Sequence, residues 1–189
     1  MHRDVYWQTN RPTGVVPPWK SLSTDVAVIG AGIGGLAAAW HLAARGIRAT
    51  LVEARTVASG ASGRNGGFFI AGPAPMYNDA RRLFGLELAR RLQQATATAQ
   101  QEIYAIADRL GAGGCFRRVG MLRLAVDANE ADHVRAHAAA LADDGFAGRL
   151  VSEAELPEPL RREGRIGLMT DHDAAVHPVQ WLAALAAAL

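Results

Sequence analysis

The residues best suited to chemistry in this sequence form a glycine-rich turn. The run Gly30-Ala31-Gly32-Ile33-Gly34-Gly35 matches G-x-G-x-x-G, a spacing typical of dinucleotide-binding turns. Gly30 permits a tight turn, Gly32 lets a pyrophosphate approach the backbone without an intervening Cβ, and Gly35 allows close packing of helix on strand. The free N–H groups at the start of a helix then attract phosphate oxygens. The turn therefore predicts a phosphate-binding site.

A carboxylate follows at the distance that such a site requires. Glu53 comes about 20 residues after the first glycine, where an acidic residue can accept hydrogen bonds from ribose hydroxyls. Its charge would repel a ribose 2′-phosphate, which disfavours NADP. In the plainer interpretation the glycines only make a turn and Glu53 is a solvated surface charge. The order of strand, turn, helix and acid favours the dinucleotide site.

The elements that must position these residues read as a βαβ unit. An apolar run at 26–29 precedes the glycines, and a stretch rich in alanine and leucine extends to Arg45. Gly46 then stands where a helix end needs a left-handed residue, and residues 48–53 resume as a β-rich run. Strands joined by a crossover helix are parallel. We therefore expect an α/β fold.

The segment after Glu53 separates two classes of dinucleotide enzyme. In an ordinary NAD-binding unit the second strand leads quickly into another helix, whereas here residues 59–67 are rich in small residues and glycine. Ser62, Arg64 and Asn65 supply donors, and the arginine could pair bidentately with a pyrophosphate. The alternative is a flexible surface loop. The pattern favours a loop that lies along an extended anionic cofactor.

At this point the sequence resembles the FAD-dependent oxidoreductases of the D-amino-acid oxidase (DAO) type, especially the gamma-glutamylputrescine oxidoreductase and glycine/sarcosine oxidase branches. The likeness is carried by Tyr6-Trp7, by the stretch 25–36 and above all by the run 60–67, Gly-Ala-Ser-Gly-Arg-Asn-Gly-Gly. The run 175–178, Ala-Val-His-Pro, resembles the family's second βα step more weakly. The resemblance extends along the whole chain but covers only about the first half of such an enzyme.

The resemblance implies a Rossmann-like FAD-binding βαβ unit with the start of an α+β substrate (cap) domain. It implies an oxidoreductase that oxidises the C–N bond of a small amine or amino acid by hydride transfer to the flavin, with oxygen as acceptor. The loop at 59–67 has no histidine, so non-covalent FAD is expected. The residues implied to bind FAD are Gly30, Ala31, Gly32, Ile33, Gly35, Glu53, Arg55, Ser62, Arg64, Asn65 and Gly66, and no catalytic residue or metal ligand is implied.

Four segments are expected from the same likeness. Residues 1–24 form an N-terminal arm, 25–75 the FAD-binding unit, 76–164 a helical and β-hairpin segment of the cap domain, and 165–189 a return strand and helix of the FAD domain. The last helix reaches Leu189 without a capping signal. We therefore expect a chain that stops before the enzyme is complete.

The middle of the chain predicts helices and a hairpin. Residues 79–110 read as mainly helical, with Thr96 and Thr98 weakening the middle so that two helices are an alternative. Residues 116–126 read as two strands that meet near Gly120. A buried stripe on the helical segment is expected from Leu83, Leu86, Leu88, Leu92, Ile103, Ile106 and Leu110.

Three further polar features have plain interpretations. Asp171-His172-Asp173 could suggest metal ligands, but neighbours in an extended segment face opposite sides, which favours a polar turn. His177 precedes a proline and is expected where a helix begins rather than as a base. Cys115 is expected to be a small buried residue or a quiet surface thiol.

Composition limits the remaining classes. Half of the residues are hydrophobic and a fifth charged, with a net charge of +2, as in globular proteins. Without a dense Lys/Arg run, nucleic acid is not expected as a partner. Without a long apolar run, neither a signal peptide nor a membrane span is expected. A single cysteine favours a reducing compartment, hence a cytoplasmic location, and the sequence leaves the oligomeric state open.

Two alternative functions stay open. An inactive truncated remnant or a nucleotide-binding module would explain the glycine turn without catalysis. An NAD-dependent dehydrogenase would also explain the turn, but the loop at 59–67 argues against it.

Overall fold

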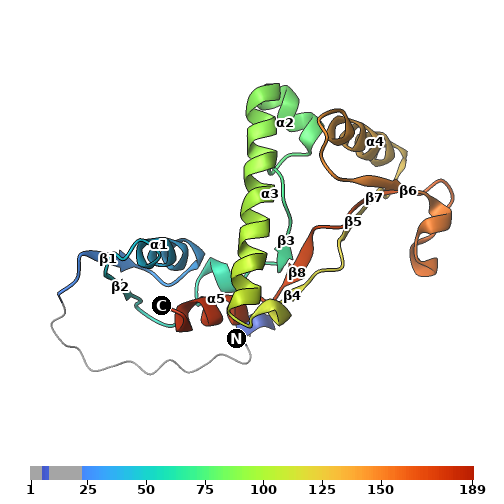
Figure 1. Cartoon of the computed structure of the whole chain (residues 1–189). Coiled ribbons are helices and arrows are strands. Elements are labelled where there is room, and N and C mark those ends of the chain that lie inside the picture. Colours follow the sequence, from blue (N-terminus) through green and yellow to red (C-terminus); the bar gives the residue numbers. More distant parts are fainter. Residues whose placement is uncertain (1–5, 9–22) are drawn as a thin grey trace. The chain divides into compact units, whose positions relative to one another are not determined.

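The computed structural model describes residues 6–8 and 23–189. It divides into two compact units (Figure 1). The first consists of Met1–Phe68, Ile106–Phe116 and Val176–Leu189, and the second of Phe69–Ala105 and Arg117–Ala175. Most of the expected N-terminal arm, residues 1–24, lies outside the described residues.

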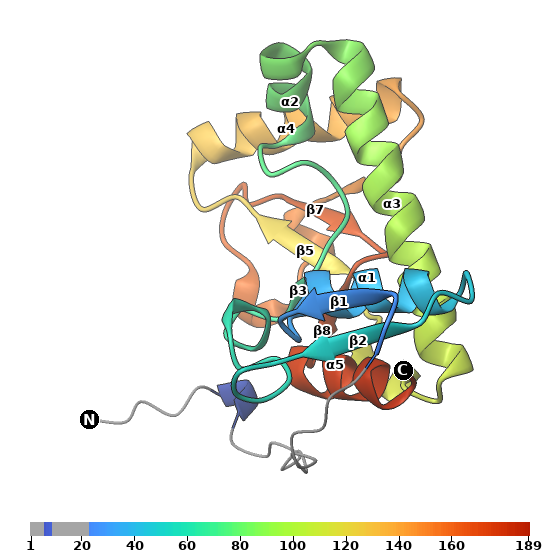
Figure 2. The same cartoon turned by 90° about the vertical axis from the view of Figure 1, so that its left-hand side faces the viewer.

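The first unit contains the expected βαβ unit. Strand β1 (Val26–Ile29), helix α1 (Ile33–Ala43) and strand β2 (Ala49–Val52) follow one another. The strands are parallel, with Val26 opposite Ala49 and Ile29 opposite Val52, and Figure 2 shows α1 alongside the pair. Gly46 has a φ of +71°, the left-handed conformation expected just past a helix end. The α/β expectation for this unit is confirmed.

Close packing at the start of α1 explains why glycine occupies position 35. A Cβ added to Gly35 would lie 1.9 Å from the carbonyl oxygen of Gly30, nearer than any real contact allows. The helix therefore lies directly on the turn, with Leu36 and Ala39 buried beneath it. This matches the role expected for the third glycine of the motif.

The remaining elements of the first unit are short turns and one helix. They are the 3-10 turns η1 (Tyr6–Gln8), η2 (Ala61–Gly63) and η3 (Gly113–Cys115), and helix α5 (Pro178–Ala187). Pro178 occupies the first turn of α5, where a missing N–H costs no hydrogen bond. Trp181 is buried on this helix, with its ring 5.4 Å from that of Phe116.

The second unit contains helices α2 (Tyr77–Phe84), most of α3 (Leu86–Arg109) and α4 (Ala128–Asp143). Strands β5 (Met121–Leu124), β6 (Arg149–Val151) and β7 (Gly167–Thr170) form an antiparallel sheet in the order β5-β7-β6. The turns η4 (Glu153–Glu155) and η5 (Glu158–Leu160) lie between β6 and β7 in the chain. Figures 1 and 2 both show α2 beside α4.

A buried polar network joins α2 to α4 in the second unit. Tyr77 is fully buried, and its hydroxyl donates a hydrogen bond of 2.6 Å to Asp144, which also pairs with Arg90. The Tyr77 N–H donates to Nδ1 of His137 at 2.8 Å. Burial, aided by the positive charge of Arg123, lowers the pKa of His137 to about 4. His137 is therefore a neutral acceptor near neutral pH.

A third sheet has the strand order β3 (Phe68–Phe69), β8 (Ala174–Val176) and β4 (Phe116–Arg117). The expected hairpin at 116–126 is wrong, because β4 pairs with β8 whereas β5 pairs with β7. Between the two strands, the N–H of Gly120 donates to the carbonyl of Asp173 rather than to the preceding strand. The expected range 165–189 is also divided, since β7 belongs to the second unit and α5 to the first.

The helical segment 79–110 differs from expectation in two ways. It does consist of two helices, but they separate at Gly85, with a φ of +80°, and not at Thr96. The Thr96 hydroxyl bonds back to the carbonyl of Leu92 and is accommodated within α3. The expected buried stripe is wrong at its start, because Leu83, Leu86 and Leu88 are 43–61% exposed. Among the described residues, no helix is long and apolar enough to span a membrane.

Candidate functional site

The glycine turn presents unpaired donors at the start of α1. Gly30 adopts a φ of +99° and donates its N–H to the carbonyl of Val52 at 2.8 Å, which fixes the turn to β2. Gly32 caps the helix without a side chain. The N–H groups of Gly32 and Gly34 pair with no other described residue. Backbone donors at a helix start form an anion-binding site.

Glu53 is held beside this turn by two backbone groups. Its Oε2 accepts a hydrogen bond from the N–H of Ala31 at 2.8 Å, and its Oε1 accepts one from Arg55 at 2.9 Å. The pKa of Glu53 is lowered mainly by the hydrogen bond from the Ala31 N–H, and secondly by the hydrogen bond from the Arg55 N–H. The carboxylate is therefore ionised and oriented at neutral pH, with lone pairs left for a further donor.

The segment after Glu53 folds back on the glycine turn. We call residues 58–67 the cofactor loop, after the role that the sequence analysis predicts for this segment. Its first residue, Ala58, is buried with a φ of +58°, and its N–H donates to the carbonyl of Ala31 at 3.0 Å. The hydroxyl of Ser62 accepts the N–H of Ile33 at 3.1 Å. Two hydrogen bonds thus dock the loop on the turn.

The polar side chains of the cofactor loop divide into two kinds. Asn65 is used within the loop, since its amide donates to the carbonyl of Ser62 at 2.8 Å and accepts the N–H of Gly67 at 2.9 Å. Arg64 is exposed and makes one bond of 3.3 Å to the carbonyl of Gly60. Asn65 shapes the loop, whereas Arg64 is available to an anion outside it. Gly66 and Arg55 are also exposed.

The expected site residues of the first unit therefore gather in one place. The turn, Glu53 and the cofactor loop are joined by direct hydrogen bonds. Sequence reasoning gave no role to Gln8, whose amide faces three carbonyls of the loop. No motif marks such a contact, and only the Tyr6-Trp7 likeness pointed to this stretch.

The other polar candidates have structural roles. Asp171-His172-Asp173 forms a turn, as expected, and no described group of side chains could hold a metal ion. His177 stands at the start of α5, where its Nδ1 accepts the N–H of Gln180, which confirms the expectation. Cys115 is partly buried, and burial raises the pKa of its thiol.

Asp173 has a role that the sequence did not show. Its side chain is buried and accepts hydrogen bonds from three groups: the N–H of Ala71 (3.0 Å), the amide of Gln100 (2.9 Å) and the hydroxyl of Thr170 (2.5 Å). The carboxylate thereby ties together three parts of the second unit that are distant in sequence.

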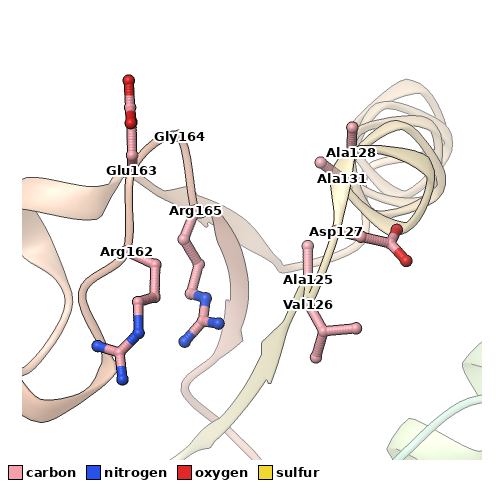
Figure 3. A pocket seen from close by; sticks show the side chains of 9 residues that line it. All are labelled: Ala125, Val126, Asp127, Ala128, Ala131, Arg162, Glu163, Gly164 and Arg165. Atoms are coloured by element: carbon pink, nitrogen blue, oxygen red, sulfur yellow. The ribbon is translucent and has the colours of Figure 1, made fainter.

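A pocket in the second unit contains none of the predicted site residues. It is lined by the start of α4, including Asp127, and by the loop with Arg162, Glu163 and Arg165. Figure 3 shows the two arginines extending in the same direction and Glu163 in the opposite one. The arginines donate to backbone carbonyls, and Asp127 already caps α4. The pocket offers no built ligand site.

Comparison with known proteins gives consistent matches. The sequence profile of the family described as FAD dependent oxidoreductase (DAO) matches residues 25–189. The chain is 27% identical over 183 residues to YhfW of Bacillus subtilis, a candidate Rieske 2Fe-2S iron-sulfur protein, covering 96% of this chain and 35% of the relative. It is 37% identical over 73 residues to gamma-glutamylputrescine oxidoreductase of Escherichia coli, covering 39% of this chain and 17% of the relative.

A solved structure shares the fold. Glycine oxidase from Geobacillus kaustophilus aligns with a TM-score of 0.68 at 23% identity, covering 86% of this chain and 43% of that one. The chain therefore spans less than half the length of these relatives.

Proposed function

The chain belongs to the family of FAD-dependent oxidoreductases, and on that basis we propose that its first unit binds FAD for the oxidation of a C–N bond in a small amine or amino acid. Relatives named for such activities include gamma-glutamylputrescine oxidoreductase and glycine oxidase. The Rossmann-like arrangement of β1, α1 and β2 is that of a dinucleotide site.

One observation supports this proposal most strongly. The Ser62 hydroxyl accepts the N–H of Ile33 at 3.1 Å, which places the cofactor loop against the glycine turn. An NAD-binding unit would continue from β2 into a helix, but here no α-helix begins between Glu53 and Tyr77. The loop after β2 thus fits a cofactor that extends beyond the glycine turn, as FAD would.

The residues present fit the parts of FAD that carry charge and hydroxyl groups, which are the pyrophosphate and the ribose. In this proposal Gly30, Ala31, Gly32, Ile33 and Gly35 form the turn that lies against the pyrophosphate, and the unpaired N–H groups of Gly32 and Gly34 supply its donors. A Cβ added to Gly34 would meet nothing within 4 Å, so the turn is open on that side. Glu53 would accept ribose hydroxyls, and Arg55 would lie towards the adenosine.

The cofactor loop would hold the remainder of the pyrophosphate. Arg64 would pair with a phosphate, Gly66 would allow close approach, and Ser62 and Asn65 would keep the loop in shape. The loop carries no histidine, so we propose non-covalent FAD.

Bound FAD would supply a hydride acceptor, a chemistry that side chains do not offer. The chain's own residues then have to bind the cofactor, keep Glu53 ionised and exclude a ribose 2′-phosphate. We assign no catalytic residue. Oxygen as acceptor, a cytoplasmic location and a small-molecule substrate stay predictions of this proposal.

Flavin titration with a matched pair of arginine variants tests the proposal. Arg64 and Arg45 are both exposed, and each donates to the carbonyl four residues earlier. We expect the purified protein to bind FAD, with flavin absorption bands, and not NAD. Arg64→Ala should weaken FAD binding by about tenfold, since one charge-assisted contact is lost, while Arg45→Ala should not.

The outcomes separate the candidate functions. Folded protein without flavin bands after reconstitution would contradict the proposal and favour the inactive remnant. Tighter binding of NAD than of FAD would favour a dehydrogenase. Equal FAD affinity in the two arginine variants would remove Arg64 from the site.

A further inference from the structure

We propose that the turn Tyr6–Gln8, here called the latch, holds the cofactor loop in its FAD-binding conformation, with Trp7 and Gln8 as positioning residues. This inference rests on the proposed function and adds residues that the glycine motif does not include. The contacts between the latch and the loop join residues 50 to 58 positions apart in the sequence, and both segments belong to the first unit.

Trp7 fixes the far end of the loop. Its indole Nε1 donates a hydrogen bond of 2.8 Å to the carbonyl of Asn65. Its ring lies edge-on to that of His177, at 4.9 Å between centroids. The ring also closes over Gly67, where an added Cβ would lie 2.6 Å from the indole. The residue next to Arg64 is therefore held from outside the loop.

Gln8 fixes the near end of the loop. Its amide nitrogen lies 3.3–3.5 Å from three carbonyl oxygens, those of Ala58, Ser59 and Gly63. Converging carbonyl dipoles repel one another unless a donor lies between them, and the two amide N–H groups supply that donor. The conformation around Ala58, with its positive φ, is thus supported by a side chain from the latch.

This support extends directly to the phosphate-binding turn. Ala58 accepts from Gln8 through its carbonyl and donates to the carbonyl of Ala31 through its N–H. The N–H of Ala31 in turn donates to Glu53. Ala58 alone therefore separates the latch from the turn, and Ala58 and Ala31 together separate it from the carboxylate. A loop already held in its bound conformation loses less entropy when the cofactor binds.

Variants of the latch test the inference in the purified protein. Trp7→Phe keeps an aromatic ring and removes the indole donor. Gln8→Leu removes the amide at similar size, and Gln8→Glu places a carboxylate against three carbonyls. Trp40→Phe, on the partly buried face of α1, is the matched tryptophan control.

We expect a graded loss of FAD affinity. Loss of one hydrogen bond should weaken binding by about two- to tenfold in Trp7→Phe and Gln8→Leu. Gln8→Glu should bind FAD more weakly than Gln8→Leu, because repulsion is added to the lost donor. Trp40→Phe should bind like the unaltered protein. Far-ultraviolet circular dichroism first establishes that every variant is folded. The dissociation constant for FAD is then measured for each variant under the same conditions.

A second measurement needs no variant. Because coupling between sites is reciprocal, FAD should slow hydrogen exchange at the latch as well as at residues 58–67. Equal FAD affinity in the unaltered protein, Gln8→Leu and Gln8→Glu would overturn the inference, as would protection of the loop without the latch. If the unaltered protein binds no FAD, the proposed function fails first, which distinguishes the two failures.

Discussion

The Glu53 carboxylate lies 2.8 Å from the backbone nitrogen of Ala31 and accepts its hydrogen bond. This contact joins the end of β2 to the middle of the glycine turn. A charged acceptor bonded to backbone N–H groups is a strong interaction, so the carboxylate stabilises the turn before any cofactor is present. Glu53 has a structural role as well as the proposed contact with ribose.

Substitution of Glu53 should weaken FAD binding, although this side chain is only partly buried. In Glu53→Gln one carboxylate oxygen becomes an NH₂ group that faces a backbone N–H, so we expect about tenfold weaker FAD binding from the lost acceptor. Glu102→Gln, an exposed position on α3, is the control. Isothermal titration with FAD measures both. Similar affinities would show that the carboxylate contributes nothing to the site.

The two adjacent glycines of α1 should respond oppositely to alanine. Gly35→Ala places a Cβ 1.9 Å from the Gly30 carbonyl, so we expect loss of about 1–3 kcal/mol of stability from the forced shift and little FAD binding. Gly34→Ala meets open space and should be neutral or stabilising by up to about 1 kcal/mol, because alanine favours helix. Chemical denaturation and FAD titration test the pair. A Gly35→Ala protein as stable as Gly34→Ala would contradict the geometry.

Substitution of two aspartates in one turn should have different effects on the stability of the protein. Asp173→Asn replaces one carboxylate oxygen by an NH₂ group, which then faces either the Thr170 hydroxyl or the donors of Ala71 and Gln100, and an unsatisfied buried donor costs about 1–3 kcal/mol. Asp171 is exposed, so Asp171→Asn should change stability by less than about 0.5 kcal/mol. Urea unfolding curves give both values. Equal stability of the two variants would show that the three donors can be satisfied without the carboxylate.

Acid should destabilise the second unit through His137. Its pKa is about 4 in the folded state, against a usual value of 6.5, so the unfolded chain binds more protons between these values. The contribution of the neutral imidazole is complete above pH 6.5 and decreases as the pH falls towards 4. The loss should reach at most about 3 kcal/mol.

His137→Asn isolates this effect. Asparagine can still accept the N–H of Tyr77 but does not titrate, so stability measured by denaturation should depend less on pH between 6.5 and 4. His133→Asn, exposed on the same helix, is the control. A pH dependence that is the same in both variants would assign the acid sensitivity to other groups.

The βαβ unit could be predicted from sequence because its signals are local. Glycine is needed for a positive φ at Gly30 and Gly46 and for close packing at Gly35, and each of these needs arises from residues nearby in the sequence. From its composition and the family likeness, the sequence predicts only that the cofactor loop lies along an extended anionic cofactor. Its internal bonds were not predicted, because they depend on Ala58 adopting a positive φ, which the residue type does not suggest.

The errors lie where burial depends on distant partners. Hydrophobicity assigned the buried face of the helical segment to leucines, yet Gln100 is buried because its amide donates to the carbonyl of Phe69 and to Asp173. The expected hairpin failed because β5 found its partner in β7, some forty residues later in the chain. Contacts of this kind leave no periodic trace in the sequence.

The cofactor loop is held by segments from opposite ends of the sequence, which the ribosome makes at widely separated times. Gln8 reaches it from the beginning of the chain, while Val176 donates its N–H to the carbonyl of Gly67, and Val179 lies against Gly63. Because contacts between distant residues form late, the loop attains its full set of partners only after α5 has been synthesised. A nascent chain that ends before α5 would therefore carry the glycine turn but an incompletely braced loop, so cofactor capture is expected to follow synthesis of α5.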